Sequence, residues 1–199
     1  MKYFLFFLTI ISQSILFAQF SDDFSDGEFT TNPVWSGDGG LFTVTSGELN
    51  SQSPGAATYY LSTPSTITSN AQWEFFIDLK FSTSGANFVD VYLMSNTADL
   101  TVATDGYFVR FGTTTDEISL YNTVGGVESL LIDGVDGLIN SGTTNPFNIK
   151  VTRTTSNDWD LQYDDGATGS FISAGIINDA AVNSSGFFGV LIEQSAAAS

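Results

Sequence analysis

The sequence contains no cysteine and no histidine, and it has few basic residues. Without cysteine, neither disulfides nor thiolate metal sites can stabilise the fold, so burial of apolar side chains must do so. Without histidine, a Ser-His-Asp or Cys-His mechanism of the usual kind is excluded. The charge is one-sided, because 22 acidic residues face 5 Lys and Arg. A net charge of −17 would repel nucleic acid and anionic membrane surfaces.

Apolar and small polar residues make up most of the sequence. Charged residues make up only 14% of the chain, against about 25% in an average soluble protein. The 18 phenylalanines and the 42% of hydrophobic residues supply enough apolar surface for a folded core, so disorder is not expected. Ser, Thr, Asn and Gly form most of the polar remainder, a composition typical of extracellular β-proteins.

The N-terminus has the pattern of a signal peptide. Lys2 precedes an apolar run from Tyr3 to Ile11 and a second from Ile15 to Phe17, and Ala18 supplies a small residue at the end. A membrane helix is the alternative, but polar residues at 12–14 interrupt a stretch shorter than the ~20 residues that a bilayer requires. We therefore expect residues 1–18 to be removed and the protein to be secreted or held at the cell surface without being an integral membrane protein. Residues 19–199 then form a single domain.

Period-two alternation of apolar and polar side chains predicts β-strands along this domain. It is clearest from Trp73 to Ser82, where five apolar side chains fall on one face that we expect in the core: Trp73, Phe75, Ile77, Leu79 and Phe81. Six similar segments are Phe88–Met94, Tyr107–Phe111, Ile118–Asn122, Phe147–Arg153, Asp158–Tyr163 and Phe187–Ile192. Weaker candidates lie near Phe42, Leu49, Tyr59 and Leu130. Glycine-containing turns separate these short strands, which indicates an all-β sandwich or barrel.

Three segments resemble one family. Residues 21–44, 73–81 and 184–190 are similar to the concanavalin A-like lectin/glucanase (LamG-like) domains that follow the signal peptide in secreted and cell-surface proteins of gliding Gram-negative bacteria. The resemblance implies an antiparallel two-sheet jelly-roll sandwich, with the first and last strands side by side and further domains often following. Such relatives continue with another acidic strand. We therefore expect a C-terminally truncated domain, in which a strand at Asp22–Phe24 lacks its neighbour.

The enzymes of this fold carry Glu, Asp and Glu on alternate residues of one strand. The matching residues here are Glu74, Phe76 and Asp78, so the middle acid is missing. In an ideal strand the Cα atoms of Glu74 and Asp78 lie about 13 Å apart, whereas glycosidase carboxyl pairs lie ~5.5 Å or ~6.5–9.5 Å apart. We therefore predict a non-catalytic protein, with a polysaccharide hydrolase or lyase as the weaker alternative.

Asp22 and Asp26 are candidate ligands for a structural calcium ion. They precede Gly27 in an acidic segment, and calcium prefers six to eight oxygen ligands. In the resembling domains an ion often ties the first strand to the last. The alternative is that both residues serve only the turn, since Asp and Gly are common turn residues.

Outward-facing aromatic and polar residues of the middle strands could bind a glycan. Alternation places Asp90, Tyr92, Arg110 and Tyr121 on the outward faces of their strands, a mixture suited to neutral sugars. Trp35 lies in a loop rich in Gly and Asp, where it could either stack on a ligand or plug one end of the sandwich.

The remaining tryptophans and cations are expected to be structural. Trp73 and Trp159 fall on the apolar sides of their strands, and each of the four mature cations is expected to pair with an acid on a neighbouring strand: Lys80, Arg110, Lys150 and Arg153. The sequence thus favours a non-catalytic carbohydrate-binding or adhesion module that recognises polysaccharide or a cell-surface glycan. A structural spacer domain is the main alternative.

Overall fold

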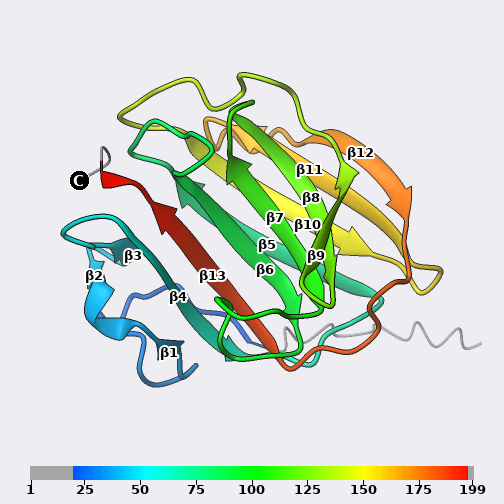
Figure 1. Ribbon diagram of the computed structural model, residues 1–199, viewed down its shortest axis with the longest axis horizontal. Coiled ribbons are helices and arrows are strands. Elements are labelled where there is room, and N and C mark those ends of the chain that lie inside the picture. The colour runs from blue at the N-terminus through cyan, green and yellow to red at the C-terminus, as the bar shows by residue number, and fades with distance from the viewer. Residues whose placement is uncertain (1–19, 197–199) are drawn as a thin grey trace, which may run out of the picture.

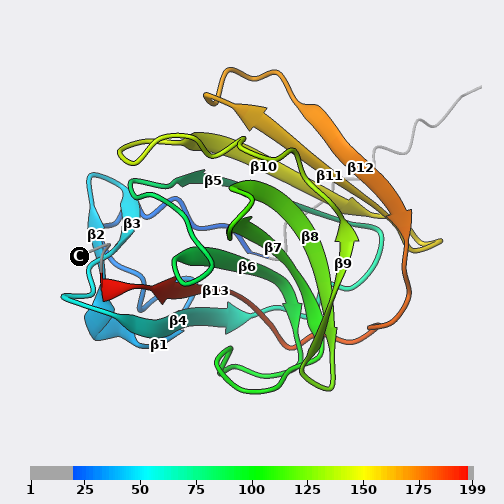
Figure 2. The same ribbon diagram turned by 45° about the horizontal axis from the view of Figure 1, so that its top comes forward.

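Antiparallel β-strands form two packed layers in the computed structural model, which describes residues 20–196 (Figures 1 and 2). A short 3-10 turn, η1 (Gly39–Leu41), precedes β2 (Phe42–Thr45). No helix within residues 20–196 is both long and apolar enough to cross a bilayer. The predicted signal peptide, residues 1–18, lies outside the described residues.

The larger layer is a seven-stranded sheet in which the last strand lies between earlier ones. Its spatial order is β1 (Ser36–Gly37), β4 (Ala57–Pro64), β13 (Phe187–Gln194), β6 (Phe88–Ser95), β7 (Gly106–Gly112), β8 (Glu117–Val124) and β9 (Val127–Ile132). Because β13 inserts between β4 and β6, the end of the described chain pairs with two earlier strands.

The smaller layer has four strands, and a hairpin lies at one end of the molecule. The sheet order is β12 (Ile172–Asn178), β11 (Asp158–Asp165), β10 (Pro146–Arg153) and β5 (Ala71–Asp78), and the hairpin joins β2 (Phe42–Thr45) to β3 (Glu48–Ser51). β5 is therefore one edge of the four-stranded sheet.

The core lies between the layers and follows the predicted alternation. Along β11, Trp159 and Leu161 are fully buried, while Asp160 between them points outward. Trp159 stacks on Trp73 of β5 at 5.7 Å between ring centroids and meets Tyr107 of β7 at 4.2 Å. Aromatic side chains from both layers thus close one end of the core, and the prediction that Trp73 and Trp159 are core residues is confirmed.

Most strand predictions are confirmed, but several details of the strand assignment are wrong. β5 ends at Asp78 instead of Ser82, because its partner β10 begins at Pro146, directly opposite Asp78. The sequence analysis also missed β12, in which Ile172 and Ile176 are exposed and the apolar residues do not alternate.

Another error is the strand expected at Asp22–Phe24. Phe24 has a φ of 52°, which is left-handed backbone, and its N–H is bound by the Asp22 carboxylate at 2.9 Å. This Asx-type turn replaces the extended backbone that a strand would need.

Arg110 and Lys150 pair with acids on adjacent strands as predicted, Lys80 pairs with acids outside an adjacent strand, and Arg153 pairs with none among the described residues. Lys80 lies 3.7 Å from Glu48, and Lys150 lies 3.2 Å from Glu74. Arg153 is 1% exposed and donates to three neutral oxygens, those of Thr68, Asn157 and Asn183. Its guanidinium also lies over the rings of Tyr107 and Trp159. Burial lowers its pKa, since no carboxylate pairs with it among residues 20–196.

Candidate ligand-binding face of the seven-stranded sheet

The sequence-predicted residues Asp90, Tyr92, Arg110 and Tyr121 lie together on the outer face of the seven-stranded sheet. They come from three adjacent strands, β6, β7 and β8, in which Asp90 stands opposite Arg110. Their side chains point away from the four-stranded sheet, because the residues that alternate with them fill the main core. We call this side of the sheet, around Arg110, the outer face.

A second, smaller apolar cluster supports the outer face. The ring of Phe108 lies between those of Tyr92 and Tyr121, with centroid distances of 5.0 and 5.3 Å. Phe108 is parallel to Tyr121 within 4°, which fixes the orientation of the more exposed ring. Tyr92 and Phe108 are buried, whereas Tyr121 is partly exposed. Tyr121 is therefore an aromatic residue of this cluster that can meet a ligand, as is Tyr60 of β4, which packs on the same cluster and is also partly exposed.

Gly189 of β13 allows this cluster to close. A Cβ atom at Gly189 would lie 2.8 Å from Cδ1 of Leu100 and 2.5 Å from the carbonyl oxygen of Leu61. Leu100 comes from the β6–β7 loop and is buried against Tyr92 and Leu191. Any side chain at position 189 would clash, so only glycine allows the β6–β7 loop to pack this closely on the sheet.

Arg110 organises the polar part of the outer face. Its Nε and Nη2 donate to the two carboxylate oxygens of Asp90 at 2.7 Å each. Its Nη1 and Nη2 donate to Glu128 of β9 at 2.9 and 3.0 Å. The guanidinium carbon also lies 4.6 to 5.1 Å from three ring centroids, those of Phe88, Phe108 and Tyr121. This double fork holds the side chain in one orientation.

The electrostatics of the network follow from burial. Asp90 is 2% exposed, and burial raises its pKa to about 6, although the hydrogen bonds and charge of Arg110 oppose that change. Two carboxylates surround one guanidinium, so the cluster offers no free positive charge to an anionic ligand. Glu128, whose side chain is 44% exposed, leaves acceptor oxygen at the surface.

Glu128 was missed by the sequence analysis, although a signal for it exists. Gly125 and Gly126 form a two-residue hairpin turn that sets Val124 opposite Val127 and Thr123 opposite Glu128. Continuing the register of β8 across this turn puts Glu128 on the same side as Tyr121. The sequence analysis gave only a weak strand candidate near Leu130, because the apolar residues of β9 do not alternate.

Trp35 lies away from the outer face, in the core near the N-terminal segment. It is 8% exposed and packs against the rings of Phe20, Phe24 and Phe188. Its Nε1 donates to the Asp22 carboxylate at 2.9 Å. Of the two roles that the sequence left open for Trp35, the structure favours the plug at one end of the sandwich.

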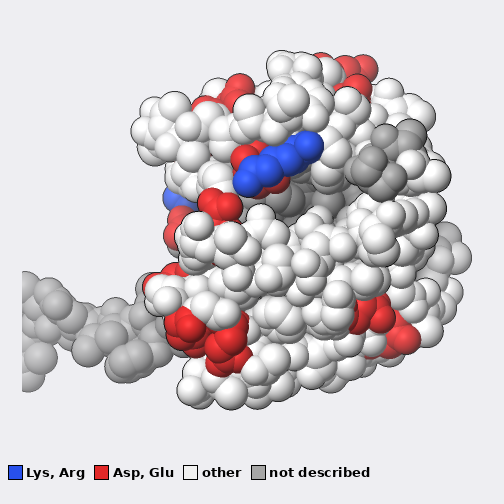
Figure 3. Space-filling view, turned by 90° about the vertical axis from the view of Figure 1, so that its left-hand side faces the viewer, with Lys and Arg blue, Asp and Glu red and all other residues white. Residues whose placement is uncertain are grey.

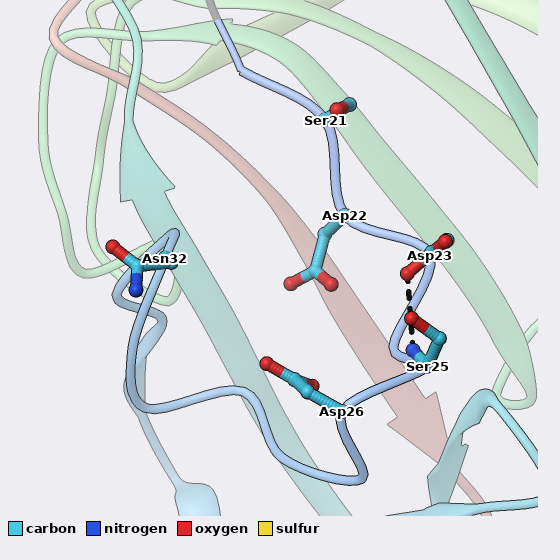
Figure 4. A pocket seen from close by; sticks show the side chains of 6 residues that line it. All are labelled: Ser21, Asp22, Asp23, Ser25, Asp26 and Asn32. Atoms are coloured by element: carbon cyan, nitrogen blue, oxygen red, sulfur yellow. Dashed lines mark hydrogen bonds between the residues drawn. The ribbon is translucent and has the colours of Figure 1, made fainter.

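Asp22 and Asp26 lie in one small pocket, but each also serves the backbone. Their carboxylates point toward each other across a loop that also carries Asn32 (Figure 4), in a pocket of about 250 Å³. Asp22 binds the N–H of Phe24 and Asp26 binds the N–H of Glu28. Residues 20–196 contain no group of three or more acidic side chains placed to hold a metal ion. Calcium binding by Asp22 and Asp26 stays a prediction.

The acids that match the glucanase strand lie on the other sheet and are held by protein groups. Glu74 pairs with Lys150, and Asp78 accepts hydrogen bonds from Thr144 Oγ1 at 3.1 Å and from the N–H of Asn145 at 2.8 Å. Phe76 separates them and is 49% exposed. The arrangement gives Asp78 a role in the turn before β10 and pairs Glu74 with a cation.

The raised pKa of Asp90 predicts a pH dependence of stability. In the folded protein Asp90 keeps a proton that the unfolded chain releases near its usual pKa of 3.8. Its contribution to stability is therefore complete below about pH 4 and is lost as the pH rises through about 6. Between about pH 5 and pH 8, we expect the wild type to lose roughly 1 kcal/mol of unfolding free energy relative to Asp90→Asn. Urea denaturation measures this difference, and a pH-independent difference would contradict the assignment.

The calcium prediction is tested by thermal melting with excess calcium and then with chelator. If Asp22 and Asp26 ligate the ion, calcium raises the melting temperature of the wild type and has no effect on Asp26→Asn. The same variant keeps an acceptor oxygen for the N–H of Glu28, so its turn is retained. Identical melting of the wild type in both solutions would leave the two acids with turn roles alone.

Similarity to solved structures identifies the fold. No family model and no curated protein matches the sequence. The carbohydrate binding module CBM66 from Bacillus subtilis aligns with a TM-score of 0.54 at 12% identity, over 80% of this chain and 88% of that chain. The VIP36 exoplasmic/lumenal domain bound to Ca²⁺ and Man3GlcNAc gives 0.56 at 9%, over 81% and 77%. The potassium-bound carbohydrate recognition domain of Emp46p gives 0.55 at 11%, over 88% of both chains. The protein therefore has the concanavalin A-like jelly-roll sandwich predicted from its sequence.

Proposed function

We propose that this protein is a non-catalytic carbohydrate-binding domain whose binding site is the outer face around Tyr121 and Arg110. The main support is the arrangement of that face, in which a fixed, partly exposed aromatic ring lies beside carboxylate and guanidinium groups. Sugars present apolar C–H faces and polar hydroxyls, so a ring bordered by hydrogen-bonding groups matches both. The printed names of the structural neighbours, a carbohydrate binding module and a carbohydrate recognition domain, agree with this proposal.

The charge of the site favours neutral glycans. Arg110 is already bound by Asp90 and Glu128, and the whole chain carries a net charge of −17. A sulfated or uronic-acid polysaccharide would meet this negative field, whereas a neutral glycan would not. The carboxylate oxygens of Glu128 can accept hydrogen bonds from sugar hydroxyls.

The site is also organised in advance of binding. Phe108 holds the Tyr121 ring, and the double fork holds Arg110, so a ligand would order few side chains. Preorganisation of this kind lowers the entropic cost of association. The sequence adds the expected location, since residues 1–18 favour export, and we propose adhesion or polysaccharide capture outside the cell as the setting.

A glycan array of neutral and anionic plant, algal and bacterial polysaccharides tests the function. We expect binding to one neutral class and no binding to the anionic ones. Tyr121→Ala should weaken that binding about tenfold or more, which corresponds to ~1.4 kcal/mol or more. Ile176→Ala is the matched control, because Ile176 is 70% exposed on the opposite sheet and should bind like the wild type.

Two outcomes would contradict the proposal. A blank array would favour a structural spacer domain instead. Binding that Tyr121→Ala leaves unchanged would place the carbohydrate site elsewhere on the molecule.

A further inference from the structure

The two partly exposed tyrosines of the outer face, Tyr60 and Tyr121, lie far apart on it. Both pack on the same apolar cluster, yet Tyr60 belongs to β4 and Tyr121 to β8. The strands β13, β6 and β7 lie between them, so four strand spacings, or about 19 Å, separate the two tyrosines across the sheet. A monosaccharide or a disaccharide is too short to touch both rings, whereas a chain of several sugars reaches from one to the other.

The position of Tyr60 is fixed by Asp38 and by β1. The N–H of Tyr60 donates to a carboxylate oxygen of Asp38 at 3.1 Å, and the N–H of Asp38 donates to the carbonyl of Tyr60 at 2.9 Å. A Cβ atom at Gly37 would lie 2.9 Å from Cε2 of Tyr60, so glycine there allows β1 to pack on the ring. Tyr60 is therefore held in place by its neighbours, as Tyr121 is held by Phe108.

A carboxylate accompanies each of the two tyrosines. The guanidinium of Arg110 lies 5.1 Å from the ring centroid of Tyr121 and binds Glu128 at 2.9 Å, so Glu128 lies on the Tyr121 side of the outer face. At the other end, burial raises the pKa of Tyr60, and the negative charge of Asp99 raises it further. Each end of the outer face thus offers a ring for the apolar side of a sugar and an acceptor for its hydroxyls.

The path along β8 from Tyr121 is closed in both directions. Ser119, the next outward residue on one side, is 1% exposed, and the loop after β9 packs on it, because the N–H of Gly134 donates to Ser119 Oγ at 2.9 Å. On the other side, Thr123 is 3% exposed and donates to the carbonyl of Thr104 in the β6–β7 loop at 3.0 Å. A chain that covers Tyr121 is thereby directed across the strands, over β7 and β6.

The strands between the two tyrosines carry both polar and apolar groups. Phe88 of β6 stands opposite Glu193 of β13, both are partly exposed, and the guanidinium of Arg110 lies 4.6 Å from the Phe88 centroid. Glu193 in turn accepts a hydrogen bond from Thr58 Oγ1 of β4 at 2.6 Å. Figure 3 views the end of the molecule where β1 lies and shows several acidic groups there and few basic ones. A chain that extends past Tyr60 therefore suits this surface best if it is neutral.

We propose that the outer face binds a linear neutral glycan lengthwise across its strands, with one sugar on Tyr121 and a sugar further along the chain on Tyr60. This inference rests on the proposed carbohydrate-binding function and adds the shape of the ligand. A single terminal sugar or a short side branch would cover one tyrosine and leave the other without a contact. A chain of several sugars covers both, so the domain selects polysaccharide over short oligosaccharides.

Isothermal titration calorimetry with two oligosaccharides tests this dependence on chain length. The probes are the disaccharide and the hexasaccharide of the neutral polysaccharide that the glycan array selects from linear glucans, mannans and xylans. The hexasaccharide should bind the wild type about tenfold more tightly or better, because it alone reaches both tyrosines.

Substitution of Tyr60 tests the second contact. Tyr60→Ala should weaken hexasaccharide binding about fivefold or more and leave disaccharide binding within about twofold, because the disaccharide is held at Tyr121. Tyr60→Phe is the matched control, since it keeps the ring and should bind both oligosaccharides as the wild type does.

Three results would overturn the lengthwise arrangement and leave the proposed function intact. They are equal affinity of the wild type for the two oligosaccharides, hexasaccharide binding that Tyr60→Ala does not weaken, and equal weakening of both oligosaccharides by Tyr60→Ala. A blank array is a different result, because it removes the carbohydrate-binding function itself. The comparison of the two oligosaccharides on the wild type keeps the test decisive if Tyr60→Ala does not fold.

Discussion

Burial of alternate side chains between two sheets is the constraint on which this structure depends. The chain has no cysteine, so no disulfide can replace a poorly packed core. Trp159 and Leu161 of β11 and Tyr107 of β7 are fully buried. The side chains next to them along each strand therefore point outward. The same alternation that fills the core therefore decides which side chains can meet a ligand. On β7, Tyr107 packs on Trp159 while Arg110, three residues later, faces outward.

Arg110 and Arg153 are both largely buried, but they have very different polar partners. Arg110 is balanced by two carboxylates and enclosed by aromatic rings, which makes it a fixed part of the outer face. Arg153 is more deeply buried, and its polar partners among the described residues are neutral oxygens. A buried charge without a counter-ion is costly. The first arrangement fixes part of the outer face, whereas the second leaves the guanidinium with neutral oxygen partners among the described residues.

Features set by local alternation could be predicted from the sequence, and features set by pairing could not. The inward row of β5 and the outward placement of Asp90 and Arg110 depend only on period two, and both were predicted correctly. The neutral partners of Arg153 come from distant loops, so no local pattern reveals them. β12 was missed because a bulge breaks its period-two pattern, with Leu161 opposite Gly175 and Gln162 opposite Ser173, and because Ile172 and Ile176 are exposed.

Hydroxyl-radical footprinting with mass spectrometry tests the alternation most directly, because it reports the exposure of individual side chains. The account predicts rapid oxidation of Phe76 and measurable oxidation of Tyr121, with protection of Trp159, Tyr107 and Phe108. Oxidation of Trp159 or Tyr107 as fast as that of Phe76 would contradict the two-layer packing and, with it, the placement of the outer face.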